Sequence, residues 1–182
     1  MLPEVIEPPQ AFRTKRLSLR WPVVEDARAI FEEYATDPEV TRYLTWEPHT
    51  ELASVAGFLR LAISGNESGE SHSWSISRVG EDRVIGMLGA RFRGYKVDVG
   101  YVLGRRHWGQ GYMPEAVSWL AEWALRQTGI FRVWAVCDVE NTASARTLEK
   151  SGFEREGLLR RWILHPNRSP EPRDCFIYAR AR

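Results

Sequence analysis

The alternation of apolar and polar positions predicts seven β-strands in this chain. Leu17, Leu19 and Trp21 alternate with polar neighbours, which is the spacing of a strand with one buried face. The same period recurs in residues 71–79 and 83–92, and a turn at Gly80–Glu81–Asp82 would join those two strands as a hairpin. The predicted strands cover residues 14–22, 71–79, 83–92, 95–103, 131–139, 154–166 and 172–182.

Helical periodicity fills most of the chain between the predicted strands. Ala27, Ile30, Phe31 and Tyr34 lie on one face of a first helix, and Asp37–Pro38 would break it before a second helical piece. Three further helices are predicted over residues 51–65, 114–128 and 141–151.

Glycine and proline mark the ends of these later helices. Pro114 suits the first turn of a helix, where its missing N–H is no loss. Gly129 and Gly152 follow the last helical residues as stop signals, and Gly65 stands near the end of the 51–65 helix.

The order of the elements predicts the fold class. A strand, two helices, three strands, a helix, a strand, a helix and two strands indicate one mixed α/β domain spanning residues 1–182. The chain has no internal repeat and no linker-rich segment that would divide it. Residues 1–10 carry three prolines and are expected to form an extended tail.

Composition and charge exclude several classes of protein. A formal net charge of +1 argues against a broad nucleic-acid-binding surface. No run of apolar residues is long enough for a membrane span, and residues 1–10 lack the features of a signal peptide. Cys137 and Cys175 are far apart and give neither a disulfide framework nor the spacing of a metal site. We therefore expect a cytoplasmic protein without a metal, acting on neither nucleic acid nor membranes.

The glycine-rich stretch at residues 104–116, GRRHWGQGYMPEA, has the composition of a phosphate-binding loop that leads into a helix. A P-loop would need a lysine and a hydroxyl residue where Gln110 and Gly111 stand, so hydrolysis of a nucleotide triphosphate is not expected. A dinucleotide fingerprint would need a third glycine where Pro114 stands. Both of these phosphate motifs are therefore excluded.

A third pattern, [Gln/Arg]-x-x-Gly-x-[Gly/Ala], fits residues 106–111. Its glycines let the backbone turn N–H groups inward, and the following helix adds its dipole, so a pyrophosphate can bind without a metal. Taken alone the pattern is equally consistent with a tight turn. Together with VGYVL before it and NTASARTLEKSGF at residues 141–153, it resembles the GCN5-related N-acetyltransferase (GNAT) superfamily, and more closely its RimJ/RimL-like subgroup of ribosomal-protein N-terminal acetyltransferases.

The resemblance implies a mostly antiparallel sheet of seven strands, splayed between the fourth and fifth and flanked by about four helices. It implies acetyl-CoA as co-substrate, with its pyrophosphate on the loop and its pantetheine arm in the splayed gap, paired with main-chain groups of residues 101–103. The residues implied to bind acetyl-CoA are Tyr101, Val102, Leu103, Arg106, His107, Trp108, Gly109, Gln110, Gly111, Tyr112 and Asn141.

Two residues are candidates for the chemistry of acetyl transfer. Asp98 stands at the acidic position of the family's E-[I/V]-G-Y pattern and is either the base that receives the amine proton or a carboxylate paired with Lys96 or an arginine. Many GNAT enzymes place a tyrosine on the last helix as the acid toward the leaving thiolate, but residues 141–151 contain none. Ser144 would serve instead, with Thr147 as a weaker substitute.

The resemblance implies an acceptor site built from the first helices, the loop at 43–50 and the strand near Arg160–Trp162. Trp46, Trp74 and Trp162 would form its apolar wall or serve as simple packing. The predicted reaction is transfer of an acetyl group to a primary amine, first of all a protein N-terminal amine. The alternatives are a small-molecule amine such as a polyamine or aminoglycoside, or a CoA-binding module without catalysis. The protein is expected to be a monomer or a homodimer.

Overall fold

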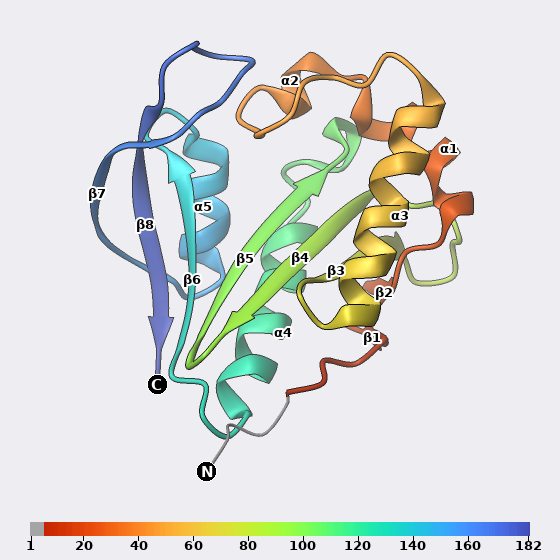
Figure 1. The fold of residues 1–182 in the computed structure, drawn as a ribbon. Helices are drawn as coiled ribbons and strands as arrows, with labels where there is room; N and C mark the ends of the chain where they lie inside the picture. Colours follow the sequence, from red (N-terminus) through yellow and green to blue (C-terminus); the bar gives the residue numbers. More distant parts are fainter. Residues whose placement is uncertain (1–5) are drawn as a thin grey trace.

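Eight strands form one sheet in the order β1-β2-β3-β4-β5-β6-β8-β7 (Figure 1). The structure is a computed structural model that describes residues 6–182. All neighbouring strands pair antiparallel except β5 and β6, which pair parallel. The strands are β1 (Ala11–Arg13), β2 (Leu17–Arg20), β3 (His72–Arg78), β4 (Gly86–Arg93), β5 (Lys96–Leu103), β6 (Arg132–Asp138), β7 (Glu154–Ile163) and β8 (Arg173–Ala181).

Helices cover both faces of this sheet (Figure 1). The 3₁₀ turn η1 (Val24–Asp26), α1 (Ala27–Ile30), the π-helical turn η2 (Phe31–Ala35), α2 (Pro38–Thr41) and α3 (Leu52–Ser68) form one group. The 3₁₀ turn η3 (Arg105–His107) leads into α4 (Tyr112–Arg126), which lies with α5 (Thr142–Lys150) on the opposite face. In the described part of the chain no helix is long and apolar enough to cross a bilayer.

Each face of the sheet has its own apolar core. The larger one packs the alternating side chains of β2 to β6 against α4, whose Ala116, Val117, Leu120 and Ala121 are fully buried. The smaller one packs α1, η2 and α3 against β4. Strand alternation therefore supplies two buried surfaces, and the helical periodicity supplies the faces that cover them.

The strands β5 and β6 separate soon after they begin (Figure 1). They pair only from Lys96–Arg132 to Asp98–Trp134, although β5 continues to Leu103 and β6 to Asp138. The predicted splay between the fourth and fifth strands of the sequence, which are β5 and β6 here, is thus confirmed.

Two features of the sheet differ from the sequence prediction. An eighth strand, β1, pairs with β2, and its three residues are too few to show a period. The predicted strand over residues 83–92 begins only at Gly86, so its hairpin with β3 has a longer connection than Gly80–Asp82. Residues 6–10 of the predicted tail have no regular structure, and residues 1–5 lie outside the described part.

Two helix ends also differ from the prediction. The helix α3 passes through Gly65 and ends at Ser68, where Gly69 takes the left-handed conformation with φ 73°. Gly65 lies close to Ser71 instead, whose hydroxyl in its present position would be 2.4 Å from a Cβ at residue 65. The helix α4 begins at Tyr112, two residues before Pro114, because Gly111 forms its N-cap.

Candidate active site

The loop between β5 and α4 owes its shape to two glycines. Gly109 and Gly111 have φ of 73° and 76°, a region that residues with a Cβ rarely adopt. Gly111 is the N-cap of α4 and has no side chain to bond the helix's first N–H groups. The first turn of α4 therefore offers main-chain donors and the positive end of a helix dipole to an anion.

Glu115 fastens this loop to the hairpin of β1 and β2. Its carboxylate accepts hydrogen bonds from the Thr14 hydroxyl and from the Arg16 main-chain N–H and guanidinium, the last at 2.7 Å. Arg16 also donates to the carbonyl of Gln110 at 2.8 Å. Burial alone would raise the pKa of Glu115, but these hydrogen bonds outweigh it and hold the pKa below its ordinary value.

Replacing Glu115 by glutamine is expected to lower the free energy of unfolding by about 1.5 kcal/mol at neutral pH. Because the pKa of Glu115 is lower in the folded protein, its stabilisation is complete above the unfolded pKa and is lost as the pH falls through the folded pKa. Urea unfolding between neutral and acidic pH measures this, with the exposed Glu67→Gln on α3 as control. A difference from wild type that does not shrink at acidic pH would contradict the assignment.

The first part of the loop, before Gly109, consists of η3 and Trp108. His107 Nε2 lies 3.1 Å from a carboxylate oxygen of Glu33 on η2. The indole N–H of Trp108 donates to the carbonyl of Leu103 at 2.8 Å, and the ring is 43% exposed. The tryptophan thus bonds the last residue of β5 while part of its side chain stays exposed.

The register of β5 decides which main-chain groups face the gap. The Phe131 N–H donates to the carbonyl of Tyr95, so odd-numbered residues of this segment turn their main chain toward β6. Tyr101 is therefore directed into the gap. Val102 is paired with Met87 on β4, and its carbonyl points at Gly86, where a Cβ would lie 2.5 Å away. The main-chain groups of Val102 therefore face β4, although the residue lines the cleft, and Tyr101 is the better placed of the two to pair with a ligand in the gap.

The loop and the gap open into one cleft of about 860 Å³. Every residue predicted to bind acetyl-CoA or to act in catalysis lines this cleft except Arg106 and Gln110, which are exposed and joined by a hydrogen bond from the Gln110 amide to the Arg106 carbonyl. The predicted residues in the lining are Asp98, Tyr101, Val102, Leu103, His107, Trp108, Gly109, Gly111, Tyr112, Asn141 and Ser144.

Tyr101 and Ser144 form a pair of hydroxyls in the cleft. The two oxygens are 2.9 Å apart, and Tyr101 Oη also lies 3.3 Å from the Ser144 carbonyl. Burial raises the pKa of Tyr101, so its hydroxyl stays protonated. Sequence reasoning assigned Tyr101 only a main-chain role. Its alternation with Val99 and Leu103 was the available signal that its side chain faces α4 and α5.

Cys137 on β6 lines the same cleft. Its side chain is buried, and burial raises the pKa of the thiol to about 11. The thiol is therefore protonated at neutral pH and behaves as a small apolar group rather than a nucleophile.

Asp98 lies where β5 and β6 separate, opposite Trp134. Its carboxylate is 3.3 Å from the guanidinium of Arg91, its register partner on β4. Asn141 is the N-cap of α5, and its side-chain oxygen accepts the Ser144 N–H at 3.1 Å. The ion pair is the structural role that the sequence left open for Asp98, and the cap gives Asn141 a structural role of its own.

The model of the acetyltransferase (GNAT) domain family matches residues 16–154, a span that includes the loop, the gap and the whole of α5. The chain belongs to this family. It is 34% identical over 150 residues to the uncharacterized N-acetyltransferase p20 of Bacillus licheniformis. The aligned residues cover 81% of this chain and 84% of the relative. GNAT enzymes are N-acetyltransferases that use acetyl-CoA as the acetyl donor.

Solved structures share the fold of this GNAT domain. The microcin C7 self-immunity acetyltransferase MccE, solved with acetyl-CoA and AMP, has a TM-score of 0.84 and 18% identity over 98% of this chain and 100% of that chain. RimL, a ribosomal L7/L12 alpha-N-protein acetyltransferase solved with coenzyme A, has a TM-score of 0.82 and 21% identity over 94% of this chain and 97% of that chain.

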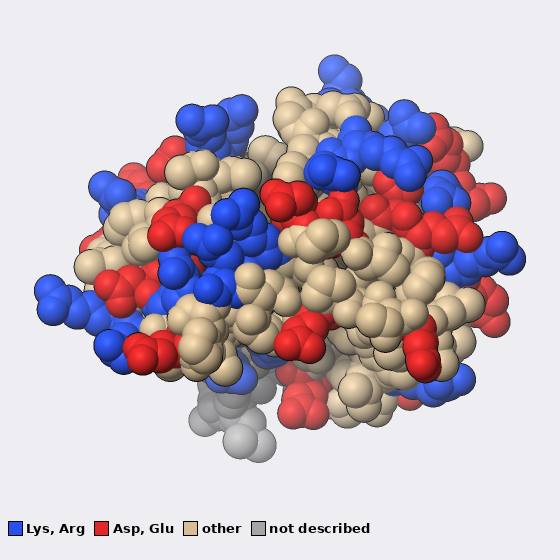
Figure 2. Space-filling view, turned by 90° about the horizontal axis from the view of Figure 1, so that it is seen from above, with Lys and Arg blue, Asp and Glu red and all other residues tan. Residues whose placement is uncertain are grey.

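The residues of this acetyltransferase suit an acetyl-CoA molecule. The positive-φ glycines place main-chain donors at the start of α4, and Arg146 and Lys150 of α5 line the same cleft. Seen from the end of the sheet where β5 finishes, Lys and Arg side chains gather in a dense cluster (Figure 2). Cations and helix dipole together favour the anionic end of the coenzyme.

Two loops that hold each other lie beside the end of the GNAT cleft that Tyr43 and Trp162 line. The Asn167 amide, between β7 and β8, donates to the carbonyls of Thr41 and Trp46 at 2.7 and 2.8 Å. Trp162 lines the cleft and is 52% exposed. Trp46 only packs against the smaller core, outside the lining. Trp74 is fully buried in the larger core, so of its two predicted roles it has that of simple packing and not that of an acceptor wall.

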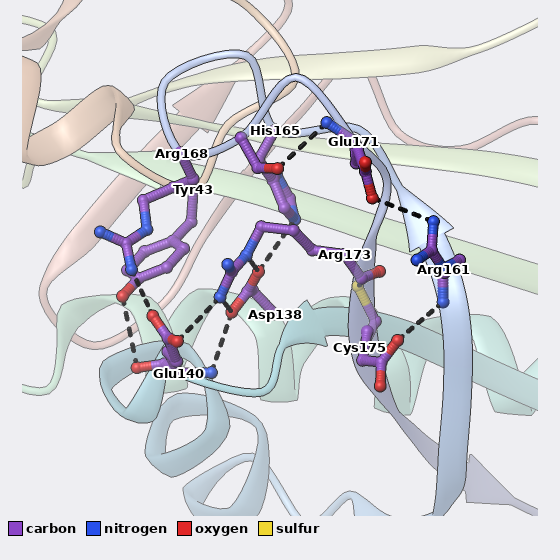
Figure 3. A network of polar contacts seen from close by, with 11 residues as sticks. Tyr43, Asp138, Glu140, Arg161, His165, Arg168, Glu171, Arg173 and Cys175 are labelled. Carbon is purple, nitrogen blue, oxygen red and sulfur yellow. Dashed lines mark hydrogen bonds and ion pairs between the residues drawn. The ribbon is translucent and has the colours of Figure 1, made fainter.

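A buried carboxylate anchors the β7–β8 loop of the acetyltransferase to the end of β6 (Figure 3). Asp138 accepts two hydrogen bonds from Arg173, at 2.6 and 3.2 Å, and one from the Glu140 N–H. His165 lies 3.8 Å from the same carboxylate, and burial lowers its pKa, so the imidazole is neutral. Glu140 also pairs with Arg168, which lies over the ring of Tyr43. Sequence reasoning missed this network, because its members are far apart along the chain.

Proposed function

We propose that this acetyltransferase transfers an acetyl group to a primary amine, and that the amine is the N-terminus of a protein. The observation that carries the proposal is the convergence of the glycine loop, the splayed gap and the Tyr101–Ser144 hydroxyls in one cleft. The RimJ/RimL-like motifs and the fold shared with RimL support a protein N-terminus as acceptor. Beyond the gap the cleft continues to Tyr43, Leu44 and Trp162, which leaves room there for the acceptor.

Main-chain groups position the donor in this proposal. The N–H groups that follow Gly109 and Gly111 bind the pyrophosphate, and the main chain of Tyr101 pairs with the pantetheine arm in the gap. The carbonyl of Leu103 is already engaged by Trp108, so Tyr101 is the pairing residue at this end of β5. Acetyl-CoA supplies an acetyl thioester, whose reaction with a neutral amine depends first on holding the two groups together.

Ser144 donates a proton to the leaving sulfur. If Tyr101 donates its hydroxyl proton to Ser144 Oγ, the Ser144 proton is free to point into the cleft that its side chain lines. Tyr101 is in this way a positioning residue for Ser144. A tyrosine on β5 and a serine on α5 together replace the helix tyrosine that the sequence lacks.

Asp98 receives the proton of the incoming amine at the point where the gap begins. Replacing it by asparagine is expected to lower kcat/KM about 10-fold without changing the affinity for CoA. Steady-state kinetics and calorimetry measure the two quantities. The Arg91→Gln variant removes the ion pair but keeps the carboxylate of Asp98. An equal loss of kcat/KM in this variant would show that the ion pair, and not proton transfer to Asp98, supports the reaction.

A free-thiol assay with acetyl-CoA tests the proposed function. Thiol release is expected with a peptide that has a free N-terminus and no lysine, and not with the same peptide acetylated in advance. Release with only polyamines or aminoglycosides would assign a small-molecule acceptor. Calorimetric binding of acetyl-CoA without thiol release from any amine would mean a CoA-binding module, and absence of binding would refute the donor site.

A further inference from the structure

Glu33 is a buried carboxylate that no step of the proposed reaction uses. It lies in η2, the π-helical turn on the acceptor side of the sheet, and its side chain is only 2% exposed. Single π-helical turns within a helix commonly occur at functional positions. Burying a carboxylate is costly unless it is paired, so its partners show what it serves.

The partners of Glu33 connect two parts of the site. Its Oε1 lies 3.1 Å from His107 Nε2 in the donor loop, and its Oε2 accepts from Arg83 at 3.3 Å. The same side chain packs directly on Gly104, where a Cβ would come within 2.8 Å of Glu33 Cγ and 2.9 Å of Oε1. Gly104 has φ −56°, so it is space and not backbone conformation that requires glycine.

A second ion pair links the same two segments. Arg105, next to Gly104, lies 3.0 Å from Asp37, the N-cap residue of α2. The start of the donor loop, residues 104–107, is therefore tied twice to the helical segment 31–41, which carries Thr41 at the acceptor end. The two ties come from different turns of that segment, so the loop and the segment are held in one relative position.

We propose that Glu33 is a positioning residue that fixes the donor loop and couples acetyl-CoA binding to the acceptor-side helices. The inference rests on the proposed function, in which this loop holds the coenzyme. A shift of the loop then moves residues 31–41, and a shift of that segment moves the loop. Because such coupling is reciprocal, an ordered donor loop also orders the acceptor end of the cleft.

If Glu33 acted through its charge alone, its removal would change the affinity for CoA in the opposite direction from the loss of a positioning contact. A carboxylate beneath a loop that binds an anion repels that anion, so its removal would strengthen binding of CoA by simple electrostatics. Loss of a positioning contact weakens binding instead, because His107 would no longer tie the loop to η2. The sign of the change therefore separates the two roles.

Isothermal titration of the full-length protein with CoA tests the inference. Glu33→Gln is expected to bind CoA about 10-fold more weakly than wild type. The matched control is Glu32→Gln, the exposed neighbour that also pairs with Arg83 but does not touch the loop, and it should stay within about 2-fold. Unchanged or tighter binding by Glu33→Gln would overturn the inference. Failure of the wild type to bind CoA would refute the proposed function instead.

Hydrogen exchange measures the coupling between CoA binding and residues 31–41 without any assay of activity. CoA is expected to slow exchange in residues 31–41 of the wild type, and less so in Asp37→Asn, which loses the pair with Arg105 but keeps an N-cap side chain on α2. This second variant leaves the buried site intact and so keeps the test available if Glu33→Gln does not fold. Equal protection of residues 31–41 in both proteins, or none in the wild type when CoA is bound, would overturn the inference.

Discussion

Replacing Ser144 by alanine is expected to lower kcat about 100-fold, while the affinity for CoA changes less than about 2-fold. Ser144 is the hydroxyl on α5 that lines the cleft and has Tyr101 Oη at 2.9 Å, so its loss leaves the sulfur without a proton donor. The cradle for the pyrophosphate, formed by Gly109 and Gly111, remains intact. Steady-state kinetics with saturating acetyl-CoA and calorimetric titration with CoA measure the two effects.

The Tyr101→Phe variant distinguishes a hydroxyl pair from a lone serine. It should lower kcat about 10-fold, because the Ser144 hydroxyl loses the donor that orients it. Thr142→Ala, on the same helix but outside the cleft lining, is the control. Turnover of Ser144→Ala at the wild-type rate would remove Ser144 from the mechanism, and an unaffected Tyr101→Phe would remove the orienting role.

The Asp138→Asn variant is expected to lose about 3 kcal/mol of unfolding free energy at neutral pH. Asp138 is 1% exposed, and its loss of charge leaves Arg173 facing a neutral amide. Burial would raise the pKa of Asp138, but the Arg173 hydrogen bonds and the Glu140 N–H outweigh it and lower the pKa. The neutral His165 cannot supply the compensating charge, so Arg173 must.

The pH dependence of unfolding supplies the check on this ion pair. A lowered folded pKa means that the stabilisation by Asp138 is full above the unfolded pKa and is lost as pH falls through the folded pKa. Urea unfolding should therefore show the gap between wild type and Asp138→Asn closing in acid. Glu154→Gln, an exposed carboxylate on β7, is the control, and equal losses for both variants would disprove the assignment.

The sequence predicted the elements best where periodicity ran over many residues. Strands β2 to β8 each have alternation or an apolar run to mark them, whereas β1 has three residues and no period. The end of α3 was misjudged because Gly65 reads as a stop signal, while the structure uses Gly65 for a close contact with Ser71 and stops the helix at Gly69. Local signals cannot separate these two uses of glycine.

The site was predictable only where its residues are neighbours in the chain. The glycine loop and the N-cap of α5 are local patterns with a local cause. The pairs Tyr101–Ser144, Asp138–Arg173 and Glu33–His107 join residues between 35 and 74 positions apart, so only the fold brings them together. The alternation of Trp74 with serines fits a pocket wall and a core strand equally well, and only its complete burial in the structure decides for the core.

The short seam between β5 and β6 gives the sheet two leaves. One leaf contains β1 to β5 and the other β6 to β8, and paired residues join them only from Lys96 to Asp98. A ligand that pairs with the main chain of Tyr101 would act as an inserted strand and connect the two parts of the sheet by hydrogen bonds. Donor binding would then add main-chain pairing beyond Asp98 and add the binding free energy to the stability of the folded protein.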